Sequence, residues 1–172
     1  MKLVLLSSKM LAVAFFSLLL FSCGKDKPAA DEYGIYFKLN GTQMNFPEFD
    51  RATHNEMGGN HALTISAEKA SVGPSINLVS DQNDFTTGKV YVVDVPAIGG
   101  KNMMEYYPVY NDYDNGWNTL PPDGQEAKLI VRITEANDVF VKGTFEAFLF
   151  QHNGSTEKSL VTDGRFYVRY PH

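Results

Sequence analysis

The chain has 172 residues and a formal charge of −5, because 20 aspartates and glutamates outnumber 15 lysines and arginines. This acidic balance argues against nucleic acid as a partner, since the phosphate backbone is also negatively charged. The single cysteine cannot form a disulfide within the chain, so the hydrophobic core has to stabilise the fold. Aromatic residues make up 13% of the chain and are mostly phenylalanine and tyrosine, which favours strands over helices.

The first 23 residues predict an export signal. Lys2 and Lys9 give the start of the chain a positive charge, and the apolar run Met10–Phe21 follows. A run of about a dozen residues is too short to span the hydrocarbon core of a bilayer and suits the core of a secretory signal. The tetrapeptide LFSC at 20–23 places a small residue directly before Cys23 and resembles a bacterial lipobox. The resemblance implies cleavage before Cys23 and acylation of this cysteine, for example with palmitate. The alternative is an ordinary signal peptide with a chance cysteine.

These features divide the chain into three parts. Residues 1–22 are expected to be a lipoprotein signal peptide. Residues 23–32 (CGKDKPAADE) are expected to be the lipidated cysteine and a short, polar, flexible tether. Residues 33–172 are expected to form a single domain, whose length suits one sizeable hydrophobic core.

Alternating apolar residues predict strands in the first half of this domain. Tyr33–Leu39 and Thr42–Phe46 flank Asn40-Gly41, which is a strong hairpin signal. The polar segment Asp50–Asn60 is typical of a loop or an irregular edge. Further strands are expected at His61–Glu68, Ser75–Ser80 and Lys89–Val95.

The second half combines a long irregular segment with further strands. Lys101–Gly124 predicts a long ordered loop, with a short strand at Met103–Tyr107. Gly143 predicts a bulge or bend inside the longest strand, and Asp163-Gly164 predicts a break between the last two strands. The remaining strands are expected at Ala127–Thr134, Asp138–Gln151, Lys158–Thr162 and Arg165–Tyr170.

The pattern as a whole predicts an all-β fold. About ten short strands with frequent turns, and no sustained helical periodicity, are typical of an antiparallel sandwich or barrel. We expect an antiparallel β-sandwich, because bulges, unequal strand lengths and a long loop fit a regular closed barrel poorly. A partly closed β-barrel is the alternative.

Four short segments carry a resemblance to a family. They are YFKLNG at 36–41, LIVRIT at 129–134, VKGTFEA at 141–147 and TDGRF at 162–166. Together they resemble a pattern found in small Bacteroidetes lipoproteins of unknown function. The resemblance implies a β-sandwich lipoprotein on a Gram-negative envelope. It implies no activity, because the shared residues are turn glycines and core aromatics.

The aromatic segment inside Lys101–Gly124 is the candidate binding site. Exposed tyrosine and tryptophan rings stack on sugars or form hot spots of protein interfaces, and nearby carboxylates bond hydroxyl groups. The alternative is that these rings pack down onto one end of the domain. The candidate ligand-binding residues are Tyr106, Tyr107, Tyr110, Asp112, Tyr113, Asp114 and Trp117.

No metal, cofactor or catalytic site is predicted. The segment 112–116 (DYDNG) lacks the ligand spacing of an EF-hand calcium loop. His54, Glu56 and His61 lack the spacing of metal ligands on one strand face or one helix, so we expect surface histidines. The chain has no G-x-S-x-G motif and no glycine-rich phosphate loop, and we do not expect an enzyme.

The sequence therefore predicts a non-catalytic lipoprotein of the cell envelope. Its lipid on Cys23 would anchor it to the outer membrane, at the cell surface or on the periplasmic face. The domain would be a binding or accessory module for a glycan or an envelope protein. The alternative is a structural subunit of an envelope assembly, joined to its neighbour by edge-strand pairing.

Overall fold

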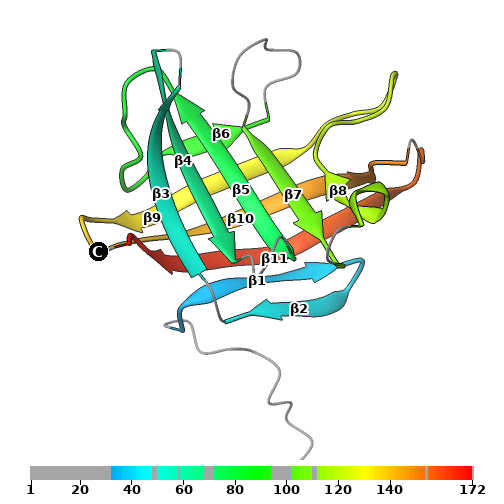
Figure 1. The fold of residues 1–172 in the computed structure, drawn as a ribbon, viewed down its shortest axis with the longest axis horizontal. Helices are drawn as coiled ribbons and strands as arrows, with labels where there is room; N and C mark the ends of the chain where they lie inside the picture. Colours follow the sequence, from blue (N-terminus) through cyan, green and yellow to red (C-terminus); the bar gives the residue numbers. More distant parts are fainter. Residues whose placement is uncertain are drawn as a thin grey trace, which may run out of the picture.

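The computed structural model describes residues 32–47, 50–57, 59–67, 72–93, 102–109, 112–153 and 155–171 (Figure 1). The strands are β1 (Gly34–Leu39), β2 (Thr42–Phe46), β3 (Asp50–Met57), β4 (Asn60–Ala67), β5 (Gly73–Ser80), β6 (Val90–Val92), β7 (Met103–Tyr107), β8 (Trp117–Asn118), β9 (Leu129–Ala136), β10 (Phe140–Gln151) and β11 (Lys158–Arg169). A single 3-10 turn, η1 (Tyr113–Asn115), is the helical element of the described residues. The predicted signal peptide and Cys23 lie outside these residues.

The strands form one antiparallel sheet that curls into a half-barrel. Its order is β2-β1-β11-β10-β8-β7-β5-β4-β3, and β9 and β6 branch from β10. Along one edge β10 pairs first with β9 and, at its last two residues, with β8, so β10 passes from one wall of the sheet to the other. In Figure 1, β3, β4, β5 and β7 form a front wall that crosses in front of a back wall of β9, β10 and β11, and β1 continues the back wall below them. The all-β, antiparallel prediction is confirmed. The curl is that of a partly closed barrel, and its two walls face each other as in a sandwich.

The two walls share one aromatic core. Phe37 of β1 is fully buried, and its ring centroid lies 5.8 Å from Phe46, 5.8 Å from Tyr106 and 5.9 Å from Phe145. These rings come from β1, β2, β7 and β10. Contacts between large aromatic rings at this separation stabilise a core beyond the area they bury. Phe37 therefore joins the front wall to the back wall.

The predicted hairpin at Asn40-Gly41 is confirmed. Both residues have positive φ, 48° and 85°, as a two-residue hairpin turn of the primed type requires. The Asn40 side chain also reaches the next strand, where its oxygen accepts a hydrogen bond from the Leu160 amide at 2.8 Å. The turn therefore closes one hairpin and fixes its position against β11.

Two reciprocal glycine–phenylalanine pairs lie at the centre of the back wall. Gly143 of β10 is opposite Phe166 of β11, and Phe145 of β10 is opposite Gly164 of β11. Each ring covers the glycine on the other strand: a Cβ at Gly143 would overlap the Phe166 ring, and a Cβ at Gly164 would lie 2.7 Å from Cδ2 of Phe145. The two rings stack with centroids 6.4 Å apart. The glycines are therefore sites of close packing.

The predicted break at Asp163-Gly164 is wrong, because β11 continues through it. Asp163 has φ of 52°, and the register of β11 shifts here against both β1 and β10, which is a β-bulge. Lys38 of β1 forms an ion pair with Asp163, with Nζ and Oδ2 2.7 Å apart. The predicted irregularity at Gly143 is confirmed as a register shift between β10 and β9.

Asp50–Asn60, expected to be a loop or an irregular edge, is a regular strand at the edge of the sheet, so the loop prediction is wrong and the edge position is correct. Its residues form β3 and the turn into β4, and all eight residues of β3 are paired with β4. Ala52 is the residue of β3 that the core buries completely, so the strand has too little apolar alternation to be recognised. The predicted strand Lys89–Val95 is shorter in the described residues, where β6 covers Val90–Val92.

Replacing Gly164 with alanine (Gly164→Ala) should lower the free energy of unfolding by about 2–3 kcal/mol, because the new methyl group meets the Phe145 ring and backbone. Urea unfolding followed by intrinsic fluorescence measures this loss. The control is Thr144→Ala at an exposed position of β10, which should change the free energy by less than about 1 kcal/mol. Equal stability of Gly164→Ala and the wild type would show that the Phe145 ring does not need the glycine.

Candidate functional site

Two of the predicted binding aromatics pack against the core. Tyr106 is 6% exposed and its ring contacts Phe37 and Phe46. Trp117 is half-buried and packs against the same core. Tyr106 therefore cannot offer a ring face to a ligand, and its assignment as a binding residue is corrected to a core position.

The other predicted residues are placed differently. Tyr107 is half-buried, and its ring lies 5.5 Å from that of His152. Asp112 is half-buried and accepts hydrogen bonds from the amide and side chain of Asn115, so it holds the η1 turn. Asp114 is exposed. Tyr110 and the side chain of Tyr113 lie outside the described residues.

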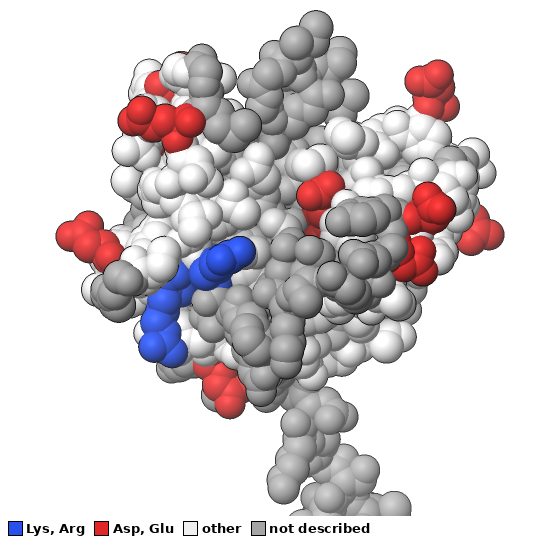
Figure 2. Space-filling view, in the orientation of Figure 1, with Lys and Arg blue, Asp and Glu red and all other residues white. Residues whose placement is uncertain are grey.

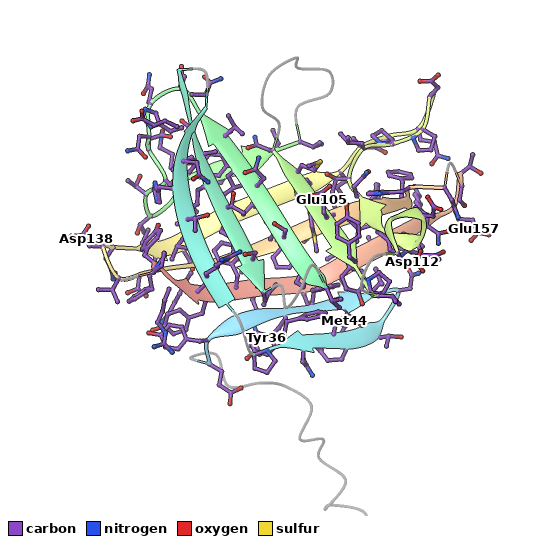
Figure 3. The ribbon with its side chains drawn as sticks, viewed as in Figure 1. Tyr36, Met44, Glu105, Asp112, Asp138 and Glu157 are labelled. Carbon is purple, nitrogen blue, oxygen red and sulfur yellow. The ribbon has the colours of Figure 1, made fainter. Side chains whose placement is uncertain are left out.

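The segment that carries these residues is tied to the end of β10. The His152 amide donates to the Gly116 carbonyl at 2.9 Å, and the Gln151 side chain donates to Asn115 at 3.1 Å. Figure 2 shows acidic side chains around this end of the molecule, where Figure 3 labels Glu105, Asp112 and Glu157. The described part of this segment covers and closes one end of the half-barrel.

A pocket lies at the opposite end, where the half-barrel is open. It has a volume of about 480 Å³, within the range of small-molecule sites, and lies where β3 approaches the end of β11. The loop after β5 and the turn between β9 and β10 complete its wall. The lining residues are His54, Asn83, Phe85, Thr86, Ala136, Asn137, Asp138 and Tyr170.

We call the line along which β3 approaches the end of β11 the seam, and this pocket the seam pocket. Three rings form its apolar side. His54 of β3 lies between Phe85 and Tyr170, with ring centroids 5.5 Å and 5.1 Å away. His54 Nε2 and the Tyr170 hydroxyl are 3.1 Å apart and share a hydrogen bond across the seam. Phe85 is 5% exposed and forms the floor, while His54 is exposed and Tyr170 half-buried. The rings therefore present a partly open aromatic surface.

Polar groups from two turns form the other side. The Asn137 side-chain oxygen accepts hydrogen bonds from the Val139 and Phe140 amides at 2.8 and 3.0 Å, which fixes the turn between β9 and β10. The side-chain nitrogen of Asn137, Nδ2, donates to no group among the described residues, whereas its backbone amide donates to the Phe140 carbonyl at 3.0 Å. Asp138 follows in the same turn and is exposed (Figure 3). Asn83, in the loop after β5, has φ of 48°, a left-handed conformation that asparagine tolerates.

Burial and the nearby Asp138 carboxylate raise the pKa of the Tyr170 phenol. The phenol therefore keeps its proton at neutral pH and can donate a hydrogen bond. A protonated phenol cannot serve as a general base. The pocket thus combines an aromatic surface, hydrogen-bonding side chains and one carboxylate.

Asp84 holds the loop that carries Phe85 and Asn83. Its carboxylate forms an ion pair with Lys89 and accepts a hydrogen bond from the Ser80 hydroxyl at 2.7 Å. These hydrogen bonds, first that from Lys89, lower the pKa of Asp84. The Tyr91 hydroxyl is directed at the Asp84 carbonyl 3.4 Å away, and burial raises the pKa of Tyr91. The loop is thereby fixed at both ends.

Sequence reasoning missed this pocket. Its residues come from four separate segments, at 54, 83–86, 136–138 and 170, and no short motif connects them.

The expected surface location of His54 is correct as to exposure, but the residue is on a strand and its ring packs between two others. Glu56 and His61 form a separate pair, 4.0 Å apart. Within the described residues, no three His, Cys, Asp or Glu side chains are grouped so as to hold a metal ion.

Replacing Asp84 with asparagine (Asp84→Asn) should lower the free energy of unfolding at pH 7 by up to about 1 kcal/mol, since the ion pair with Lys89 is partly exposed. The folded-state pKa of Asp84 is lowered, so its contribution is present above the unfolded-state value of 3.8 and is lost as the pH falls through the folded-state pKa. Urea unfolding from pH 7 downwards should therefore show the variant and wild type converging in acid. Asp81→Asn, at an exposed neighbouring position, is the control. A difference that persists unchanged in acid would contradict this role of the carboxylate.

Comparison of the chain with protein-family models, curated proteins and solved structures gives no match. No helix among the described residues has the length and apolar character needed to cross a membrane. The function has to be inferred from the chemistry of the chain's own residues, and the seam pocket supplies most of it.

Proposed function

We propose that the chain is a non-catalytic lipoprotein of the outer membrane, tethered through Cys23, whose domain is a binding module for a glycan or an envelope protein. The observation that carries the binding role is the seam pocket, which combines an aromatic surface with neutral polar groups. The tether rests on the lipobox-like sequence LFSC at 20–23 and the polar residues after it. The Bacteroidetes resemblance agrees with this placement.

The chemistry of the pocket favours binding over catalysis. Tyr170 retains its proton, and its hydroxyl is engaged with His54 Nε2. The Asn137 oxygen is used inside its own turn. What remains for a ligand is a set of weak, oriented contacts, which suits reversible recognition.

A lipid anchor would make such a module act at a surface. Each buried methylene of an acyl chain contributes about 0.8 kcal/mol, so two or three chains hold a protein stably where one does not. A tethered module with a weak pocket still captures its ligand efficiently, because ligand and protein are confined to the same surface.

The alternative is a structural subunit joined by edge-strand pairing. One observation favours it: Val90 and Val92 of β6 are 44% and 51% exposed, beside exposed Ile130 of β9. Among the described strands β6 pairs with β9 alone, and a short apolar edge can accept a strand of another chain.

Replacing Cys23 with serine (Cys23→Ser) should abolish incorporation of labelled palmitate and release the protein from the membrane fraction, because serine offers no thiol for acylation. Metabolic labelling of cells expressing the full chain measures this. Ser22→Ala keeps a small residue before the cysteine and should label normally. Mass spectrometry that finds a free Cys23, or a different N-terminus, would overturn the tether.

Replacing Tyr170 with alanine (Tyr170→Ala) should reduce retention of glycans or envelope proteins by the detergent-solubilised mature protein at least about tenfold, as expected for losing a central aromatic contact. Tyr107→Ala, at the opposite end, tests the aromatic segment as the rival site. Thermal unfolding shows whether each variant folds. If Tyr170→Ala does not fold, Tyr170→Phe, which keeps the ring and removes the hydroxyl, takes its place. Co-purification with an envelope complex that resists Tyr170→Ala but is lost on Val92→Lys would favour the structural alternative.

A further inference from the structure

The hydrogen-bonding groups of the seam pocket restrict its ligand. The side-chain oxygen of Asn137 accepts hydrogen bonds from the Val139 and Phe140 amides, so Asn137 meets a ligand as a donor through its side-chain nitrogen. The carboxylate of Asp138, beside it, accepts hydrogen bonds and cannot donate one when it is ionised. A ligand therefore has to accept one hydrogen bond and donate another within the width of one turn. Hydroxyl groups do both, whereas an ammonium group only donates.

The aromatic surface of the pocket suits the apolar face of a sugar ring. His54 and Tyr170 lie 5.1 Å apart at an interplanar angle of 52°, so they form an open corner rather than a closed cage. An open corner covers one face of a flat ligand and leaves its edge to the polar turn opposite. A quaternary ammonium group is instead recognised by rings on several sides.

The charge of the pocket restricts the ligand further. Among its lining residues Asp138 is the carboxylate, and no lysine or arginine is present. Figure 2 shows basic side chains on the same side of the molecule as this end, below the acidic group at its edge, and none of them is a lining residue of the pocket. A ligand carboxylate at this position would meet a like charge and no cation, which costs binding free energy.

From these three features we propose that the seam pocket binds the terminal residue of an uncharged glycan, with one ring face on Tyr170 and His54 and its hydroxyls at Asn137 and Asp138. The Asp138 carboxylate excludes glycans that end in a uronic acid. This proposal rests on the proposed binding function and narrows it to one class of ligand. Asp138 is the residue that determines specificity, and Tyr170 supplies affinity.

The test uses the mature lipoprotein in detergent micelles and immobilised oligosaccharides in matched pairs. One member of each pair ends in glucose, galactose or mannose, and the other ends in the corresponding uronic acid. The wild type should retain at least one neutral member about tenfold more tightly than its acidic partner, as expected for one pair of like charges at a partly exposed site. This preference should shrink at 1 M salt, where such charges are screened.

Asp138→Asn removes the charge and keeps the shape, so it should bring the acidic partner within about threefold of the neutral one. Glu157→Gln removes one negative charge at the opposite end of the molecule (Figure 3) and should leave the preference unchanged. An identical shift in both variants would mean that net charge sets the preference, and Asp138 would lose its role.

Other outcomes separate this inference from the function on which it rests. If the wild type retains an acidic glycan at least as tightly as its neutral partner, or retains only an amine or a peptide, and this retention is lost on Tyr170→Ala, the inference is overturned and the binding function stands. Failure to retain any of the oligosaccharides would also overturn it. Retention that is unaffected by Tyr170→Ala would overturn both, since the pocket would then not be the site.

Discussion

The fold depends on the close contact between β10 and β11, where Gly143 lies under the Phe166 ring and Gly164 under the Phe145 ring. Neither strand could shift by one residue without moving its inward side chains to solvent, so the pair fixes the register of the back wall. The bulge at Asp163 adds one residue to β11 and displaces its register against both neighbours. The end of β11 is thereby set, and with it the position of Tyr170 at the seam.

The seam is the place where the curled sheet fails to close. β3 is the last strand of the sheet path and lies close to β11, yet no ladder joins the two strands in the described residues. A hydrogen bond between the side chains of His54 and Tyr170 spans the gap instead. Because side chains need more room than backbone hydrogen bonds, the gap stays open as a pocket. The unpaired edge and the candidate site thus have one cause.

Much of the fold could be predicted, because several strands alternate clearly between apolar residues that face the core and polar residues that face solvent. Leu129, Val131 and Ile133 of β9 alternate with exposed residues, and all three are buried. Asp163-Gly164 misled because the pair is a common turn signal, whereas here the glycine makes room for the Phe145 ring. β3 could not be told from a polar loop, because Ala52 is the residue within positions 51–56 that is fully buried and the other residues there are polar.

The candidate site could not be predicted in the same way. His54, Asp138 and Tyr170 are each ordinary residues in their local sequence, and only the bulge, the β9–β10 turn and the curl of the sheet bring them together. The aromatic segment inside Lys101–Gly124 was predicted as the site because its rings lie close together in the sequence. In the structure Tyr106 and Trp117 close the other end of the core instead.

The two ends of the half-barrel therefore differ in how their aromatic side chains are placed. At one end aromatic side chains bury themselves between β7, β8 and β10, so binding there would compete with stability. At the other end Phe85 belongs to the core, and Ala136 and Tyr170 pack against it while remaining partly exposed. A ligand held between Tyr170 and Asp138 would contact His54 of β3 and the β9–β10 turn at once. It would bridge the seam and stabilise the folded half-barrel, and the gain in free energy would rise with the logarithm of ligand concentration above the Kd, since the ligand binds the folded state alone.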